Sequence, residues 1–393
     1  MAASLLSTVL VDMSLNTLSN MQIQVSYLGS GGALELINCS THGQSSNGHL
    51  HHFIWRKPIP MALLWTILVP FLSLLACLLS IPQIFVHIQT RNFAASVFAI
   101  SSVTANFQNF INALIWPRFD PWNSFNGKIL CDIEVKAYIG LGLAMIGAVT
   151  SILRQMAIIL EPNRRVMTAS PLQRYIRVAF EAFFCVVLPL IMMATHYVVQ
   201  TFRYVIVPLS GCTLVYDNSW VSVLLQFIWP PLVCLLGSVY CILCIIRLFR
   251  QRRQTLTVLP SLPAAIRARY LRLFGLACSS LVLFLPLSIY TFSQNALVVQ
   301  HPYSWSQTHP PDWVSRVLWT AEIPSIIGFD RWVQIAIGFV GFGFFGLGNE
   351  AIAMYKTWMR RIKVAMRRSA KGHGHGQVEA RRARTDHASE ISL

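Results

Sequence analysis

Charged residues are absent from long stretches of this chain. Four blocks contain no Asp, Glu, Lys or Arg, and each exceeds the roughly 20 apolar residues that cross a bilayer as a helix: 61–86, 93–116, 221–246 and 273–300. Three further blocks are equally apolar apart from one to four charges: 131–160, 175–200 and 332–355. The bilayer core has no water to satisfy the backbone, and the blocks are far longer than barrel strands, so they must be helices. The pattern predicts an all-α membrane protein, a seven-transmembrane helix bundle with helices at about 61–86, 93–116, 131–160, 175–200, 221–249, 270–292 and 332–355.

The second block ends in the stretch NFQNFINALIW, which holds four side-chain amides among apolar residues. At 100° per residue, Asn106, Gln108, Asn109 and Asn112 fall on one side with Trp116, and the Phe and Ile residues fall on the other. The amide side is therefore predicted to face the bundle interior. Amides there either tie helices together, at about 0.6–2 kcal/mol each, or line a ligand cavity. Asn106 lies deepest and is predicted to be mainly a tie, whereas Asn109, Asn112 and Trp116 are predicted to contact ligand.

Basic residues fix the orientation of the bundle. The formal net charge is +16, and with the N-terminus outside, 22 of the 31 Lys and Arg residues fall on cytoplasmic segments. Only seven then fall on outer segments, Arg331 among them. This positive-inside bias predicts the N-terminus outside and the C-terminus in the cytoplasm. The basic charge is thus a signal of topology and of contact with the lipid bilayer, and it does not indicate a nucleic-acid partner.

Polar segments flank the bundle. We expect an extracellular tail over 1–58, the transmembrane domain over 59–358, and a basic, disordered cytoplasmic tail over 359–393. Asn38 begins an Asn-Cys-Ser glycosylation sequon in the outer tail. The histidines of both tails lack paired cysteine or acidic ligands, so no metal site is predicted.

Two of the nine cysteines fall on the oxidising side of the membrane at the mouth of the bundle. Cys131 lies at the outer end of the third helix and Cys212 in the second outer loop. A disulfide between them would fix that loop over the bundle. Cys39, in the outer tail, is the competing partner.

Charges within the spans are candidate functional groups. Glu134 and Lys136 lie near the outer end of 131–160, where they either have a role in the bundle or extend to the membrane interface. Arg154 is placed at the inner end of the same helix, where it either pairs with Glu181 or Glu350, meets a cytoplasmic partner, or is simply part of the positive-inside signal.

Prolines interrupt several spans. Each removes a backbone hydrogen bond and favours a kink. A kinked helix can act as a hinge in a bundle that transmits a signal. The predicted hinges are Pro230, Pro231 and Pro286.

Several longer strings of the chain, spread over about residues 60–360, are informative together: IPQIFVHIQTRN, FQNFINALIWP, GKILCDIEVKAYIGLGLA, VVQTFRYVIVPLSGC and FIWPPLVCLLGSVYCILCIIRLFRQRRQ. In this order they resemble the fungal lipopeptide mating pheromone receptors of the a-factor type, which are G-protein-coupled receptors of fungal class D. The resemblance implies a multi-pass plasma-membrane receptor for a secreted farnesylated peptide, coupled to a heterotrimeric G protein. It implies neither an enzyme nor a cofactor, and homodimerisation is left open. The outer tail of about sixty residues is longer than such receptors usually have.

The resemblance suggests residues for each role. A prenylated peptide needs an apolar slot with polar groups for its peptide part. The candidate ligand contacts are Asn109, Asn112, Trp116, Tyr138, Tyr197, Arg203, Tyr204 and Tyr290. The candidate G-protein contacts are Arg154, Arg247, Arg250, Arg252, Arg253, Arg267 and Arg269.

Other functions fit the pattern less well. A retinal protein would need a lysine in the middle of 332–355, which has none. A transporter would favour internal repeats or charged midplane sites. A G-protein-coupled receptor for another lipid or peptide is the main alternative.

Overall fold

The computed structural model describes most of the apolar part of the chain. The described residues are 26–28, 34–36, 59–118, 120–121, 124–161, 171–253, 264–299, 301–320, 325–346, 348, 351–361 and 363–364. Both predicted tails fall largely outside this set, and Asn38 and Cys39 lie outside it entirely.

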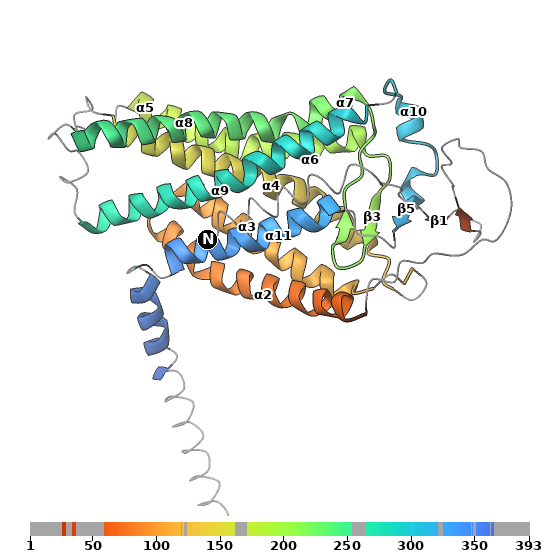
Figure 1. Cartoon of the computed structure of the whole chain (residues 1–393), viewed down its shortest axis with the longest axis horizontal. Coiled ribbons are helices and arrows are strands. Elements are labelled where there is room, and N and C mark those ends of the chain that lie inside the picture. Colours follow the sequence, from red (N-terminus) through yellow and green to blue (C-terminus); the bar gives the residue numbers. More distant parts are fainter. Residues whose placement is uncertain are drawn as a thin grey trace, which may run out of the picture.

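The helices of the described ranges form seven rods, which run side by side in one bundle (Figure 1). Four are uninterrupted helices: α2 (Ile59–Gln89), α3 (Phe93–Ile115), α4 (Lys128–Ile159) and α9 (Ala264–Leu297). Each of the other three contains a π-helical turn. One consists of α5 (Pro171–Ala182), η1 (Phe183–Val187) and α6 (Leu188–Val199), and the next consists of α7 (Trp220–Ser222), η2 (Val223–Phe227) and α8 (Trp229–Arg253). The last consists of α11 (Ser325–Gly341) and η4 (Phe342–Gly346).

Hydropathy assigns most of these rods to the membrane. Within the described residues, five stretches are long and apolar enough to cross it: Leu64–Gln89, Lys128–Ile159, Pro171–Val199, Trp229–Arg250 and Ala268–Leu297. Arg331–Gly346 and Ala351–Arg361 together form a sixth if they are one bent span. The helix α3 falls below this level of hydropathy because of its amides, yet it packs against α2, α4 and α11 within the bundle. The predicted class, an all-α membrane bundle, is confirmed.

Two of the π-helical turns are separated from a following proline by only one or two residues. The turn η1 precedes Pro189, and η2 precedes Pro230 and Pro231. Proline has no backbone N–H to donate to the turn before it. That turn can therefore widen without losing a backbone hydrogen bond. In η1 the widening brings the Phe184 carbonyl against α4, where a Cβ on Gly147 would lie 2.0 Å from it. Glycine is therefore required at this crossing.

The helix α4 forms the centre of the bundle. In its most apolar stretch 72% of the residues are buried, against 22–39% in the other four spans. The face of α3 that packs beside it is polar. Its four amides are buried, whereas Phe107 and Leu114 on the opposite face are about half exposed. The predicted separation of an interior amide face from a lipid face is confirmed.

A small sheet covers the outer end of the bundle (Figure 1). Its strands are β1 (Ser26–Leu28), β2 (Leu34–Leu36), β3 (Tyr204–Val207), β4 (Gly211–Thr213) and β5 (Val317–Trp319), in the order β2-β1-β5-β3-β4. The β3–β4 hairpin is antiparallel, and β5 pairs with β3 in parallel. Two short helices, α10 (Trp305–Thr308) and η3 (Trp313–Ser315), precede β5. We refer to β3, β4 and β5 as the outer sheet.

The seventh rod corrects one prediction from the sequence. Arg331, which the charge pattern assigned to an outer segment, lies within α11 and is buried. The bundle accommodates this cation because two helices supply it with an amide oxygen and an aromatic face, and the strand β4 supplies a carbonyl, as described below.

Candidate ligand cavity

A cavity of about 390 Å³ lies in the outer half of the bundle, between α4, α6, η2, α8, α9 and α11. Most of its wall is apolar, including Leu143, Ile146, Met192, Phe227 and Phe284. The β4 strand and the segment that follows it, up to Tyr216, also line it. The volume is in the range of small-ligand sites, and the outer sheet covers the same end of the bundle.

One wall of the cavity is polar, and Arg331 is at its centre. Among the described residues that line the cavity, Arg331 is the one charged side chain. Its Nη1 donates a hydrogen bond of 2.8 Å to Oδ1 of Asn109, and its Nη2 lies 3.4 Å from the carbonyl oxygen of Cys212. The guanidinium also stacks over the ring of Tyr138, 4.4 Å from its centroid. Arg331 therefore joins three helices and the outer sheet at one point.

The amides of α3 connect this wall to α11. Asn109 donates to Oε1 of Gln334 at 3.0 Å, in addition to accepting from Arg331. Asn106 donates to the Gln334 carbonyl at 3.1 Å and to the Ser102 carbonyl at 2.9 Å. Asn106 is thus an interhelical tie, as predicted. Asn109 positions Arg331 but is not itself part of the cavity wall.

Asn112 holds the tip of the β3–β4 hairpin. Its Nδ2 donates to the Ser210 carbonyl at 3.2 Å, and the next residue, Gly211, packs directly on its side chain. Glu134 on α4 is buried close by and interacts with both Asn112 and the charge of Arg331. The outer sheet is therefore connected to the same polar wall that Arg331 forms.

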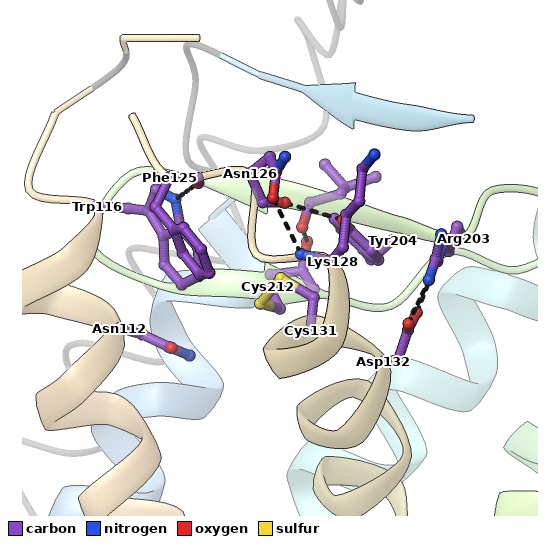
Figure 2. The surroundings of a disulfide bond; sticks show 12 residues. Asn112, Trp116, Phe125, Asn126, Lys128, Cys131, Asp132, Arg203, Tyr204 and Cys212 are labelled. Carbon is purple, nitrogen blue, oxygen red and sulfur yellow. Dashed lines mark hydrogen bonds and ion pairs between the residues drawn. A yellow bond between two sulfur atoms is a disulfide. The ribbon is translucent and has the colours of Figure 1, made fainter. Parts of the chain in front are cut away.

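Two predicted ligand contacts, Trp116 and Tyr204, are packed beneath the outer sheet instead (Figure 2). Both side chains are fully buried. Trp116 donates from Nε1 to the Phe125 carbonyl, and Tyr204 donates from its hydroxyl to the Asn126 carbonyl, both at 2.9 Å. Burial raises the pKa of Tyr204 to about 12, so it stays a neutral donor. The prediction that these residues line the ligand site is corrected, because neither borders the cavity.

A disulfide and an ion pair fasten the same sheet to α4 (Figure 2). Cys131 and Cys212 are bonded, with the two sulfurs 2.05 Å apart. Arg203, at the start of the hairpin, forms a two-pronged ion pair with Asp132, with Nε–Oδ1 at 2.8 Å and Nη2–Oδ2 at 2.5 Å. The hydrogen bond to Asp132 raises the pKa of Arg203. Arg203 thus anchors the sheet and, like Trp116, does not border the cavity.

The three remaining predicted contacts lie in different places. Tyr138 lines the cavity. Tyr197, on α6, packs against Trp305, His309 and Trp313. These three residues belong to the segment that covers the outer end of α6. Tyr290 is 43% exposed on α9 and is not part of the cavity wall. Of the eight residues, the structure therefore brings Tyr138 to the cavity directly and Asn109 through Arg331.

Sequence reasoning missed the two α11 residues that matter most, Arg331 and Gln334. The signal was present as spacing, because Arg331, Gln334, Gly338 and Gly341 recur at intervals of three and four. Polar and small residues at this period mark the interior face of a membrane helix. The long Trp- and Pro-rich segment before the helix obscured where the helix begins.

The inner end of the bundle holds the candidate G-protein contacts. Arg154 stacks over the Phe180 ring at 4.4 Å. Glu181 pairs with Arg177 at 2.9 Å and accepts from Gln155, so its contacts differ from the predicted pairing with Arg154. Glu350 lies outside the described residues. Of the other predicted contacts, Arg250 is exposed on α8 and Arg269 is half-buried on α9, while Arg252, Arg253 and Arg267 belong to the same two helices.

Gly211 offers a test of the hairpin contact. It has a φ of +68°, and a Cβ there would lie 2.4 Å from Cγ of Asn112. Gly211→Ala is therefore expected to displace the hairpin and to lower the amount of folded receptor at the surface several-fold, measured by antibody labelling of intact cells. Gly343→Ala is the matched control, because a Cβ there meets no atom within 4 Å. Equal effects of the two changes would contradict the contact.

The family model and the curated relatives that this chain matches are all described as pheromone receptors. The family model described as pheromone A receptor matches residues 68–364. The pheromone a factor receptor of Saccharomyces cerevisiae is 26% identical over 297 residues, which cover 75% of this chain and 62% of that protein. The pheromone B alpha 2 receptor of Schizophyllum commune is 27% identical over 74% of this chain and 45% of that protein. Pheromone receptor 1 of Ustilago hordei is 27% identical over 73% of this chain and 81% of that protein.

The matched region covers different shares of these relatives. It spans about half to two thirds of the length of the first two. Among solved structures, the crystal structure of squid rhodopsin aligns with a TM-score of 0.45 and 13% identity, covering 79% of this chain and 86% of that one.

Proposed function

This chain belongs to the pheromone A receptor family, and from that membership we propose that it is a plasma-membrane receptor for a secreted, farnesylated peptide pheromone. On this proposal, peptide binding changes the inner ends of the helices and activates a heterotrimeric G protein in the mating response. The observation that carries the proposal is the cavity, which combines a mostly apolar wall with polar side chains, Arg331 being the charged one among the described residues. A lipid-modified peptide presents the same combination, an apolar chain next to amide and carbonyl groups.

The proposal assigns a role to each part of the wall. The apolar residues of α4, α6 and α9 receive the prenyl chain, which buries its surface at about 25 cal/mol per Å². Arg331, supported by Asn109 and Tyr138, donates to a carbonyl oxygen of the peptide. The outer sheet is fixed over the mouth by the disulfide and the Arg203–Asp132 pair, which favours entry of the prenyl chain from the lipid side.

A panel of peptides tests this function. Prenylated and unprenylated forms of the same peptides would be added to membranes that contain the receptor and a heterotrimeric G protein, and guanine-nucleotide exchange would be measured. We expect exchange with prenylated forms only. Equal responses to both forms would favour a receptor for another peptide, and a response to the prenyl alcohol alone would favour a receptor for a lipid.

The inner ends of α4 and α8 supply a second prediction. Arg247 on α8 donates from Nη1 to the carbonyl of Ala157, in the last turn of α4. This hydrogen bond holds the two helices together. Arg247→Ala is therefore expected to raise the nucleotide exchange measured in the absence of peptide by several-fold. Phe249→Ala is the control, because Phe249 is exposed on the same helix and is not among the candidate G-protein contacts. An equal rise in both variants would contradict the role of the bond.

The remaining assignments follow from the same proposal. Pro230, Pro231 and Pro286 are the proposed hinges, and Pro286 lies inside α9. The inner arginines of α8 and α9 are proposed to face the G protein. A homodimer also stays a proposal, which crosslinking of the receptor in native membranes would examine.

A further inference from the structure

Two cysteines meet across the α8–α9 interface, well away from the disulfide on the outer side. Sγ of Cys241 lies 3.3 Å from Sγ of Cys278. Both side chains are partly exposed. The four other free cysteines of the described chain are buried. Among them, Cys185 contacts Ser151, and Cys244 points to the Leu153 carbonyl on α4.

The pair lies between the cavity and the inner end of the bundle. Cys241 follows Pro230 by eleven residues on α8, about 16 Å along the helix. Cys278 precedes Phe284 by six residues on α9, about 9 Å nearer the inner end. Pro230 and Phe284 both line the cavity. A bond between the two sulfurs would therefore join α8 to α9 on the inner side of the hinge prolines.

We propose that Cys241 and Cys278 form a redox modification site that joins α8 to α9. Two thiols react with one hydroperoxide, so that the S–S bond forms while the O–O bond breaks. Hydrogen peroxide then leaves as two water molecules, and a lipid hydroperoxide leaves as its alcohol and one water. A disulfide needs the sulfurs about 2.05 Å apart, so each moves by less than about 1 Å from its present position. Small uncharged hydroperoxides reach the pair because neither side chain is fully buried.

The bond has a consequence for signalling that rests on the proposed function. If peptide binding separates the inner ends of α8 and α9, a covalent bond at this depth prevents the separation. The oxidised receptor is then held in its resting form. Formation of the bond itself does not depend on the ligand or on the G protein.

A cleavage experiment detects the bond directly. A protease site is inserted within 254–263 of the full chain, and the receptor is cleaved in native membranes. Cys278 is the last cysteine of the chain, and Cys131 and Cys212 both precede the cut. The two fragments therefore stay joined on a non-reducing gel only if Cys278 is bonded to a cysteine of the first fragment.

We expect the fragments to stay joined after treatment with a hydroperoxide and to separate with dithiothreitol. Cys241→Ser should abolish the joined band, whereas Cys244→Ser, one turn further along α8, should keep it. Hydrogen peroxide and the apolar cumene hydroperoxide are compared in parallel, which separates an oxidant arriving from water from one arriving through lipid. Failure of both oxidants, or a joined band in Cys241→Ser, would overturn the site.

Nucleotide exchange then tests the consequence. Peptide-stimulated exchange should fall at least several-fold on oxidation and should be unchanged by the same treatment in the Cys241→Ser/Cys278→Ser variant. A joined band with undiminished exchange would overturn the proposed effect on signalling. Receptor that forms the bond but never responds to peptide, oxidised or reduced, would count against the proposed function and leave the modification site standing.

Discussion

Arg331→Met is expected to lower the potency of the peptide about ten- to a hundred-fold. Arg331 is the charged group of the cavity wall, and hydrogen bonds to charged groups contribute about 1.5–3 kcal/mol each, where 1.4 kcal/mol corresponds to a factor of ten. Methionine keeps much of the side-chain volume and removes all five donors. The measurement is the peptide concentration that gives half-maximal nucleotide exchange, normalised to the receptor at the surface.

Two further variants separate recognition from folding. Arg331→Met alone leaves the buried Glu134 without its positive neighbour, which destabilises the bundle. The double variant Glu134→Gln/Arg331→Met removes both charges, and it should recover surface level without recovering potency. Arg331→Lys keeps the charge but loses the planar stacking on Tyr138, so an intermediate potency is expected. If the double variant responded like the native receptor, Arg331 would have a structural role only.

The sequence was sufficient for the bundle and for much of α3. Long charge-free blocks predict membrane helices because the bilayer imposes both their length and their backbone hydrogen bonding. The amide face of α3 was predictable because four polar residues share one side of a helix, and lipid chains offer their amide groups no hydrogen-bond partners. Asn106 was assigned correctly for the same reason, since at its depth its amide donates to a carbonyl of α11 as well as to one of its own helix.

The cavity wall was less predictable because it depends on long-range contacts. Arg331 and Asn109 are 222 positions apart, and nothing local in either segment indicates that they meet. Trp116 and Tyr204 have the composition of ligand contacts, but backbone carbonyls of the 125–126 segment take up their donors. The π-helical turns were not predictable from the prolines alone, since proline indicates a disruption and not its form.

Loss of the outer disulfide is expected to have the second large effect. The bond closes a loop with a sequence separation of 81, for which the chain-entropy model gives about 4.5 kcal/mol of stabilisation. That is a large part of the roughly 5–15 kcal/mol that stabilises a typical protein. Cys131→Ser and Cys212→Ser should each lower the surface level of receptor at least about ten-fold, measured by labelling intact cells and by thermal aggregation in detergent.

The two single variants and the double variant should lose the same amount, because each removes the same bond and the second substitution has nothing more to remove. Cys39→Ser is the matched control, since Cys39 is the other cysteine that the topology places outside, and it should leave surface level unchanged. Additive losses in the double variant would mean that Cys131 and Cys212 stabilise the receptor separately. A loss in Cys39→Ser equal to that in one of the two would mean that the pairing in cells differs from the one described. Equal, non-additive losses would instead show that the outer sheet, with the hairpin that Asn112 holds and the carbonyl that Arg331 contacts, depends on this bond to α4.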